Sequence, residues 1–265
     1  GQATGLDAVK AVYAAVMKKL SGRDAGLGMS AAASVGQDRG SRSWLMVSSL
    51  VALGFDARLV AVRGFTADPA PYLFPNESLF PYVCIRVLLP DGTAVWLDAL
   101  VRFAPFGELP EFALGEREAY LLPMPGRPLE KVTTPKHSER PSKVVTLTAA
   151  LDEDGVLKGS GDETYQGFEA AQLAEALEQL SPDQRKQALE QALSRMFGGA
   201  DLESVDVDIR REEVVEVKVK YQFTASRFGR REGASTLVMG PLTFPWNLGR
   251  RYLVLGQRVT PLFIE

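Results

Sequence analysis

The sequence contains a single cysteine, Cys84, and a single histidine, His137, among its 265 residues. This excludes an internal disulfide and any zinc site that combines several cysteine and histidine ligands. A catalytic pair of thiol and imidazole would have to use these two residues. Cys84 falls within an apolar segment and His137 within a polar, proline-containing one, so we expect a structural role for both, no metal site and no cofactor.

Long apolar runs and a large excess of charge of one sign are also missing. No segment approaches the roughly 20 apolar residues that span a bilayer, and the first residues, GQATGLD, are no signal peptide. A fragment of a longer protein would lack such a signal as well. The net charge of −3 argues against nucleic acid or anionic lipid as the main partner.

What is present fits a globular protein of two domains. The content of 46% hydrophobic and 24% charged residues is typical of soluble proteins, and the length allows two domains of ordinary size. We place the boundary at the polar segment VTTPKHSERPS. The predicted division is a core at 1–131, a linker at 132–143 and a second domain at 144–265.

The first domain is organised around the stretch 36–54. It opens with glycine, serine and arginine residues and then becomes apolar on nearly every side, which predicts a helix covered on several faces. Gly54 stands where a left-handed helix cap is expected. Another helix is predicted at 6–20, and strands at 58–63, 82–88 and 94–100. The last two strands are joined by a hairpin turn because Asp91-Gly92 suits that conformation.

The second domain combines strands with two helices. Strands are predicted at 144–151 and up to about Tyr165, joined by a turn at 152–155, and helices at 168–180 and 182–197. The second helix has a capping serine followed by proline, Ser181-Pro182. Further strands follow, at 204–210, 214–225, 235–244 and 252–264. This order predicts an α+β domain with two helices over an antiparallel sheet.

The segments ALGFDA at 52–57 and LPDGTAVWLD at 89–98 resemble the transglutaminase-like branch of the papain-like cysteine enzymes. The chain is most similar to a bacterial multidomain type with a trailing α+β domain. The resemblance implies a transglutaminase-like core, with its buried helix against an antiparallel sheet, followed by that second domain. It also implies a location in the periplasm or cell envelope, within a larger protein.

In such enzymes a cysteine at the start of the buried helix is activated by a histidine, which an aspartate orients. Matched to that pattern, Arg39 stands at the cysteine position, Tyr82 at the histidine position and Asp98 at the aspartate position. At two of the three positions, the side chain that the reaction requires is replaced by one that cannot act as nucleophile or base. A shift of a few residues would offer Ser41 or Ser43, but no nearby histidine would activate either. The resemblance therefore implies a pseudoenzyme that serves as a protein-binding or scaffold part.

Two interpretations of the degenerate site remain open. An ion pair of Arg39 with Asp98, with Tyr82 bonded beside them, would fill the cleft; alternatively, Arg39, Ser41, Ser43, Tyr82 and Asp98 would line a small pocket for a polar or anionic group. Two further alternatives for the whole chain are a hydrolase or acyltransferase that uses Ser41 or Ser43 with Asp98, and a peptide-binding receptor module.

Three other segments admit a simple and a functional interpretation. The acidic turn at 152–155 resembles part of a calcium loop but lacks the later ligands, which favours a hairpin turn. The basic clusters at 227–232 and 250–251 suit solvated loops or a docking patch for an acidic partner. The aromatic, proline-rich run at 69–81 suits a loop that covers its own domain.

Overall fold

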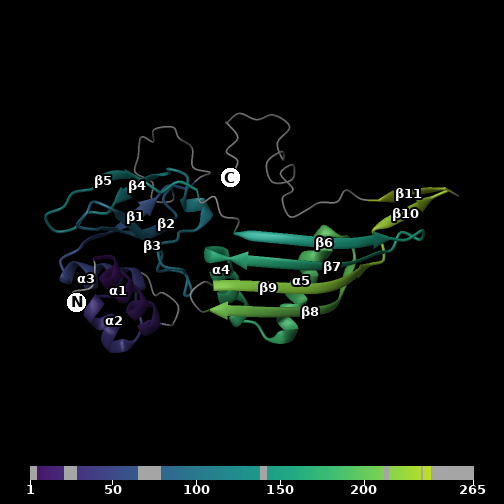
Figure 1. The fold of residues 1–265 in the computed structure, drawn as a ribbon, viewed down its shortest axis with the longest axis horizontal. Helices are drawn as coiled ribbons and strands as arrows, with labels where there is room; N and C mark the ends of the chain where they lie inside the picture. The colour runs from purple at the N-terminus through teal and green to yellow at the C-terminus, as the bar shows by residue number, and fades with distance from the viewer. Residues whose placement is uncertain are drawn as a thin grey trace.

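The computed structural model describes residues 5–20, 29–64, 79–137, 142–211, 215–233 and 235–239. These residues form five α-helices and antiparallel sheets, so the predicted α+β class is confirmed. The elements separate into an N-terminal and a C-terminal part that follow one another along the long axis (Figure 1). None of the helices in this described portion is long and apolar enough to cross a membrane.

The N-terminal part combines helices with a five-stranded antiparallel sheet of order β3-β2-β1-β4-β5. Its elements are α1 (Gly5–Lys19), α2 (Ala31–Gln37), α3 (Arg42–Ala52), β1 (Asp56–Val62), β2 (Tyr82–Leu88), β3 (Ala94–Leu97), a short 3₁₀ helix η2 (Glu111–Ala113), β4 (Glu118–Leu121) and β5 (Glu130–Thr133). The predicted hairpin joins β2 and β3. Gly92 adopts a φ of 85°, and Asp91 Oδ1 accepts from the backbone N–H of Thr93 at 2.8 Å.

The sheet carries a separate apolar cluster on each face. Alternate residues of β1 and β2, such as Leu59 and Ile85, pack with α1 and α3. The residues between them, such as Val60 and Cys84, pack with Trp96 and the η2 segment. The sheet is therefore covered on both sides, and Cys84 is fully buried, as expected for a structural cysteine.

Helix α3 is covered on several sides over its first two turns, which contain no exposed residue, but not in its last turn. Residues such as Met46 and Leu50 are fully buried, whereas Val51 is 41% exposed and Leu53 61% exposed. The expectation of a helix buried all round is therefore wrong for its last turn. Gly54 does end the helix with a φ of 87°.

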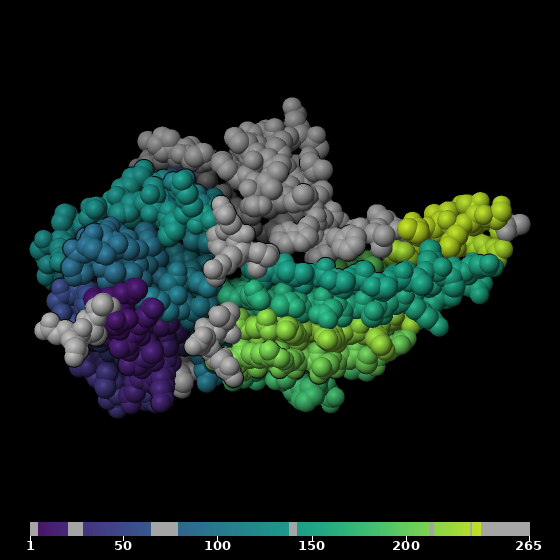
Figure 2. Space-filling view, viewed as in Figure 1, coloured from purple at the N-terminus to yellow at the C-terminus, as the bar shows by residue number. Residues whose placement is uncertain are grey.

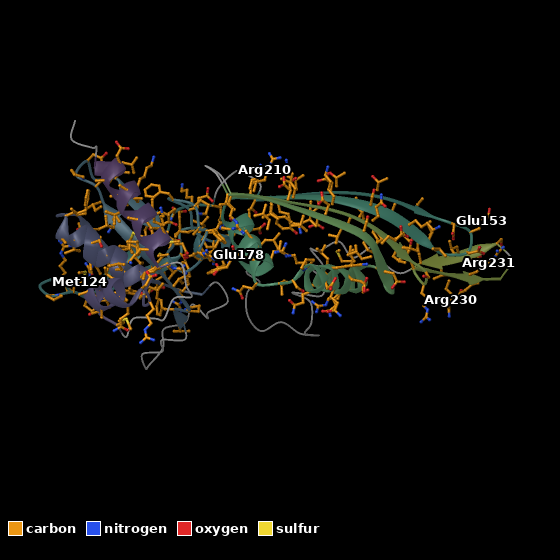
Figure 3. The ribbon with its side chains drawn as sticks, turned by 90° about the horizontal axis from the view of Figure 1, so that it is seen from below. Met124, Glu153, Glu178, Arg210, Arg230 and Arg231 are labelled. Carbon is orange, nitrogen blue, oxygen red and sulfur yellow. The ribbon has the colours of Figure 1, made fainter. Side chains whose placement is uncertain are left out.

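The C-terminal part is a four-stranded antiparallel sheet of order β6-β7-β9-β8 with both helices on one face (Figures 1 and 3). Its elements are β6 (Lys143–Leu151), β7 (Leu157–Gln166), α4 (Gly167–Glu178), α5 (Pro182–Met196), β8 (Ala200–Arg211) and β9 (Val215–Ala225). The predicted cap of α5 is confirmed, because Ser181 and Gln184 form a reciprocal capping box.

A separate hairpin of β10 (Gly229–Glu232) and β11 (Thr236–Met239) projects beyond the four-stranded sheet (Figure 2). The basic cluster expected as a loop at 227–232 thus contains a strand. The acidic segment 152–155 is a turn whose Asp152 Oδ1 accepts two backbone N–H bonds from its own loop. Across the described residues, no group of three or more His, Cys, Asp and Glu side chains is placed to hold a metal ion.

Other boundaries differ from the sequence prediction. Strands β4 and β5 were not predicted, and β5 takes up Val132 and Thr133, while Lys143 already belongs to β6, so the linker is shorter than 132–143. The segment expected as a strand at 94–100 stops at Leu97. The predicted strand at 252–264, the arginines at 250–251 and nearly all of the run at 69–81 lie outside the described residues.

Candidate functional site

Tyr82 and Asp98 meet at one end of the sheet. Tyr82 is the first residue of β2, and Asp98 follows the last residue of β3. The Tyr82 hydroxyl donates to Asp98 Oδ2 at 2.5 Å, and the two residues are 6% and 0% exposed. The aromatic ring of Phe112, on η2, packs edge-on against Tyr82 with ring centroids 5.2 Å apart. The structure thus brings together two of the predicted triad positions, inside the core.

The second oxygen of Asp98 holds the segment that leaves β3. Oδ1 accepts from the backbone N–H groups of Leu100 and Val101, each at 2.9 Å. Burial raises the pKa of Asp98, while these hydrogen bonds and that from Tyr82 oppose the shift. Both carboxylate oxygens are thus occupied by hydrogen bonds within the chain.

Neither Tyr82 nor Cys84 is suited to act as a base or a nucleophile. Burial is the largest cause that raises the pKa of each group, and the negative charge of Asp98 is the second. The phenol and the thiol therefore remain protonated at neutral pH. A reactive cysteine would need the opposite environment, with a nearby cation and access to solvent.

Arg39 lies away from this pair. It follows α2 at an exposed position, and its Nε donates to Gln37 Oε1 at 3.0 Å. The expected ion pair with Asp98 is absent from the contacts of Arg39 in the described structure. The correction has a simple cause: the backbone between α2 and α3 turns at Asp38 and Gly40, both with positive φ, before α3 begins at Arg42.

Arg42 provides the buried cation instead. It is 1% exposed, and its guanidinium donates to three backbone carbonyls, those of Ala99 at 2.8 Å, Leu20 at 3.4 Å and Leu100. Its charge also acts to lower the pKa of Asp98, against the larger effect of burial. Reading from the sequence missed this residue, because an arginine beside serines at a helix start resembles a solvated cap. A signal was present in its position one helical turn before the buried Met46.

The two serines are buried but not activated. Ser41 caps α3, with its Oγ accepting from the Trp44 backbone N–H at 3.1 Å. Ser43 is 2% exposed, and its Oγ has no hydrogen-bond partner within the described part of the chain. His137, the one imidazole of the sequence, instead contacts Glu111 Oε1 through Nδ1 at 2.5 Å. Neither serine therefore has a base.

The segment that follows Asp98 connects the two parts of the molecule. The backbone N–H of Arg102 donates to Glu175 Oε2 at 2.9 Å, and its guanidinium pairs with Glu178 at 2.6 Å. Glu178, on α4, lies at the boundary between the parts (Figure 3) and also pairs with Arg211 at 3.1 Å. Phe103 packs against the core of the C-terminal part, under the guanidinium of Arg211.

A small apolar hollow lies elsewhere on the N-terminal part. It has a volume of about 350 Å³ and is lined by Trp44, Leu59, Leu122, Pro123 and Met124. None of the five predicted site residues lines it. It has the size of the smaller ligand pockets of proteins, but it lacks charged groups that would orient a substrate.

Comparisons of the chain with models of protein families, with curated proteins and with solved structures find no match.

Proposed function

We propose that this chain is a non-catalytic, transglutaminase-like protein that acts as a protein-binding or scaffold part of a larger bacterial cell-envelope protein. The observation that carries the proposal is the state of Asp98. Its carboxylate is buried and receives three hydrogen bonds, from Tyr82 and from the backbone of Leu100 and Val101. The Tyr82 hydroxyl takes the place beside Oδ2 that a catalytic imidazole would need.

The contacts of Asp98 and Arg42 suggest what the degenerate site does instead. Both residues fix the segment that begins at Ala99, one through its N–H groups and the other through its carbonyls. That same segment supplies Arg102 and Phe103 to the boundary with the C-terminal part. In this proposal the former catalytic region stiffens the connection between two domains, as a scaffold requires.

The proposal is tested by assays for amide hydrolysis and for amine incorporation into a glutamine-containing protein, using the whole chain at high concentration. We expect rates equal to those of a variant with Cys84, Ser41 and Ser43 all replaced by alanine. A rate above that of the triple variant would contradict the non-catalytic assignment.

A hydrolase or acyltransferase remains the second candidate, because Ser43 Oγ is buried without a hydrogen-bond partner among the described residues. A serine enzyme would lose its activity in Ser43→Ala alone, whereas Cys84→Ala would keep it.

The third candidate is a peptide-binding module. The observation in its favour is the apolar hollow beside Trp44. Peptides rich in aromatic residues can be titrated into the protein while tryptophan fluorescence is monitored. A saturable change would distinguish a peptide-binding module from the other two candidates.

A further inference from the structure

The two outer strands of the C-terminal sheet differ sharply in composition. Strand β8 carries acidic and basic side chains along its length, namely Asp201, Glu203, Asp206, Asp208, Arg210 and Arg211. Strand β6 has the sequence KVVTLTAAL, in which Lys143 is the one charged residue. Charged side chains are the usual protection of a sheet edge against pairing with another strand. Edge β8 has this protection and edge β6 lacks it.

The hydrogen bonds to β7 show which backbone groups of β6 point outward. Gln166 N donates to Ser142 O, and Asp152 N donates to Val156 O, so the even-numbered residues of β6 bond to β7. The N–H and C=O groups of the odd-numbered residues therefore point away from the sheet, at Lys143, Val145, Leu147, Ala149 and Leu151. No described strand lies on that side.

Apart from Lys143, these odd-numbered residues of β6 are apolar, whereas the other face carries Val144, Thr146, Thr148 and Ala150. Leu147 and Leu151 are partly buried and pack against the core beneath the helices. A strand added beside β6 would need apolar side chains on this face and small or polar ones on the other. A second copy of β6 meets the first need, and it meets the second at every position of that face except Val144.

We propose that β6 pairs with β6 of a second copy of this chain, antiparallel and centred on Leu147, to form a continuous eight-stranded sheet in a two-fold dimer. In this register Val145 lies opposite the partner's Ala149, and Thr146 lies opposite the partner's Thr148. No like charges meet, and the threonine pairs can exchange hydrogen bonds on the open face. Two-fold dimers are the commonest closed assemblies of soluble proteins. The inference is independent of the proposed function.

The proposal is tested by measuring the mass of the chain in solution, for the wild type and for variants that carry charged residues at positions 146 and 148. We expect the wild-type chain to sediment as a dimer. Thr146→Lys with Thr148→Lys places lysines opposite lysines and should yield monomers; Thr146→Glu with Thr148→Glu should do the same with glutamates. Mixed in equal amounts, the two variants should recover a heterodimer, which loosens as salt is added.

A matched control carries the same charges on the central strand. Gln222→Lys with Thr224→Lys changes the same face of the same sheet but not the edge, so this variant should stay dimeric. Ala149→Pro removes one outward N–H without touching the bonds to β7 and should also give monomers. Circular dichroism confirms that each variant is folded. The proposal is overturned if the wild-type chain is a monomer, whether β6 is covered by other residues of the same chain or left free. It is also overturned if the variant with lysines at 146 and 148 remains a dimer.

Discussion

The hydroxyl of Tyr82 donates a 2.5 Å hydrogen bond to Oδ2 of Asp98, and both residues are buried. Burial, followed by the charge of Asp98, raises the pKa of the phenol. The pair is a polar contact that joins two strands and the segment after them. Its contribution to stability can be measured.

Asp98→Ala should destabilise the protein by about 3 kcal/mol, because one buried and two partly buried donors lose their acceptor and each unsatisfied buried donor costs about 1–3 kcal/mol. Tyr82→Phe removes a single hydrogen bond and should cost about 1–2 kcal/mol. Urea unfolding of both single variants and of the double variant gives the coupling between the two residues. Additive losses would show that the pair does not act as a unit.

Asp98→Asn separates the charge of the side chain from its hydrogen bonds. Because burial raises the pKa of Asp98 above 3.8, the folded protein binds the proton more tightly than the unfolded chain does. The free energy of unfolding that Asp98 contributes is therefore fully present below pH 3.8. It decreases as the pH rises from 3.8 through the raised pKa of the folded protein. The asparagine variant should lack that contribution and lose less stability at neutral pH than the alanine variant. A larger loss than in Asp98→Ala would be incompatible with this account.

Arg42→Met should cost about 3 kcal/mol, since two buried carbonyls and one partly buried carbonyl lose the donor that satisfies them. Arg39→Met is the matched control, with the same change three residues earlier at an exposed position, and should stay within about 0.5 kcal/mol of the wild type. Thermal unfolding of both variants checks the contrast. Equal losses would mean that Arg42 is not the buried cation of this region.

Much of the fold was predictable where local signals agree with the final packing. The Asp91-Gly92 turn and the Ser181-Pro182 cap are examples, because each specifies its conformation through its own side chains. Strand β5, with the sequence EKVT, was missed because its exposed edge position removes the alternation of apolar and polar residues. The meeting of Tyr82 with Asp98 was expected from the resemblance, which matches both residues to one site, whereas the burial of Arg42 depends on carbonyls 57 and 58 residues away. Its place one helical turn before Met46 indicates a buried position, but no local pattern identifies the distant carbonyls that it binds.

Glu118→Gln should remove part of the acid sensitivity of the protein. The hydrogen bond from Tyr120, followed by that from Arg63, lowers the pKa of Glu118 from 4.5 to about 2. A carboxyl group with a depressed pKa stabilises the fold above its unfolded pKa, and this stability is lost as the pH falls from 4.5 to about 2. Urea unfolding measured across this range should show a shallower slope in the variant. Tyr120→Phe should have a smaller effect of the same sign, and an unchanged slope in both would contradict the assignment.

Cys84 should not react with a thiol reagent such as an aromatic disulfide while the protein is folded. It is fully buried, and burial raises the pKa of its thiol, so both access and the thiolate are missing. One thiol should become reactive in strong denaturant, at a rate set by unfolding. Rapid modification of the native chain would instead indicate an exposed, activated cysteine and would revive the possibility of thiol chemistry.

Gly161→Ala should destabilise the C-terminal part by about 1–3 kcal/mol, the usual cost of overpacking a core. A Cβ atom at Gly161 would lie 2.2 Å from the ring of Tyr221, whose hydroxyl bonds to Glu163 Oε1 at 3.0 Å. The ring must move, and that hydrogen bond must lengthen or break. Gly198→Ala is the control, because nothing lies within 4 Å of its new methyl group, and it should be neutral or slightly stabilising. If Gly161→Ala behaves like the control, Tyr221 does not pack over the glycine as the structure has it.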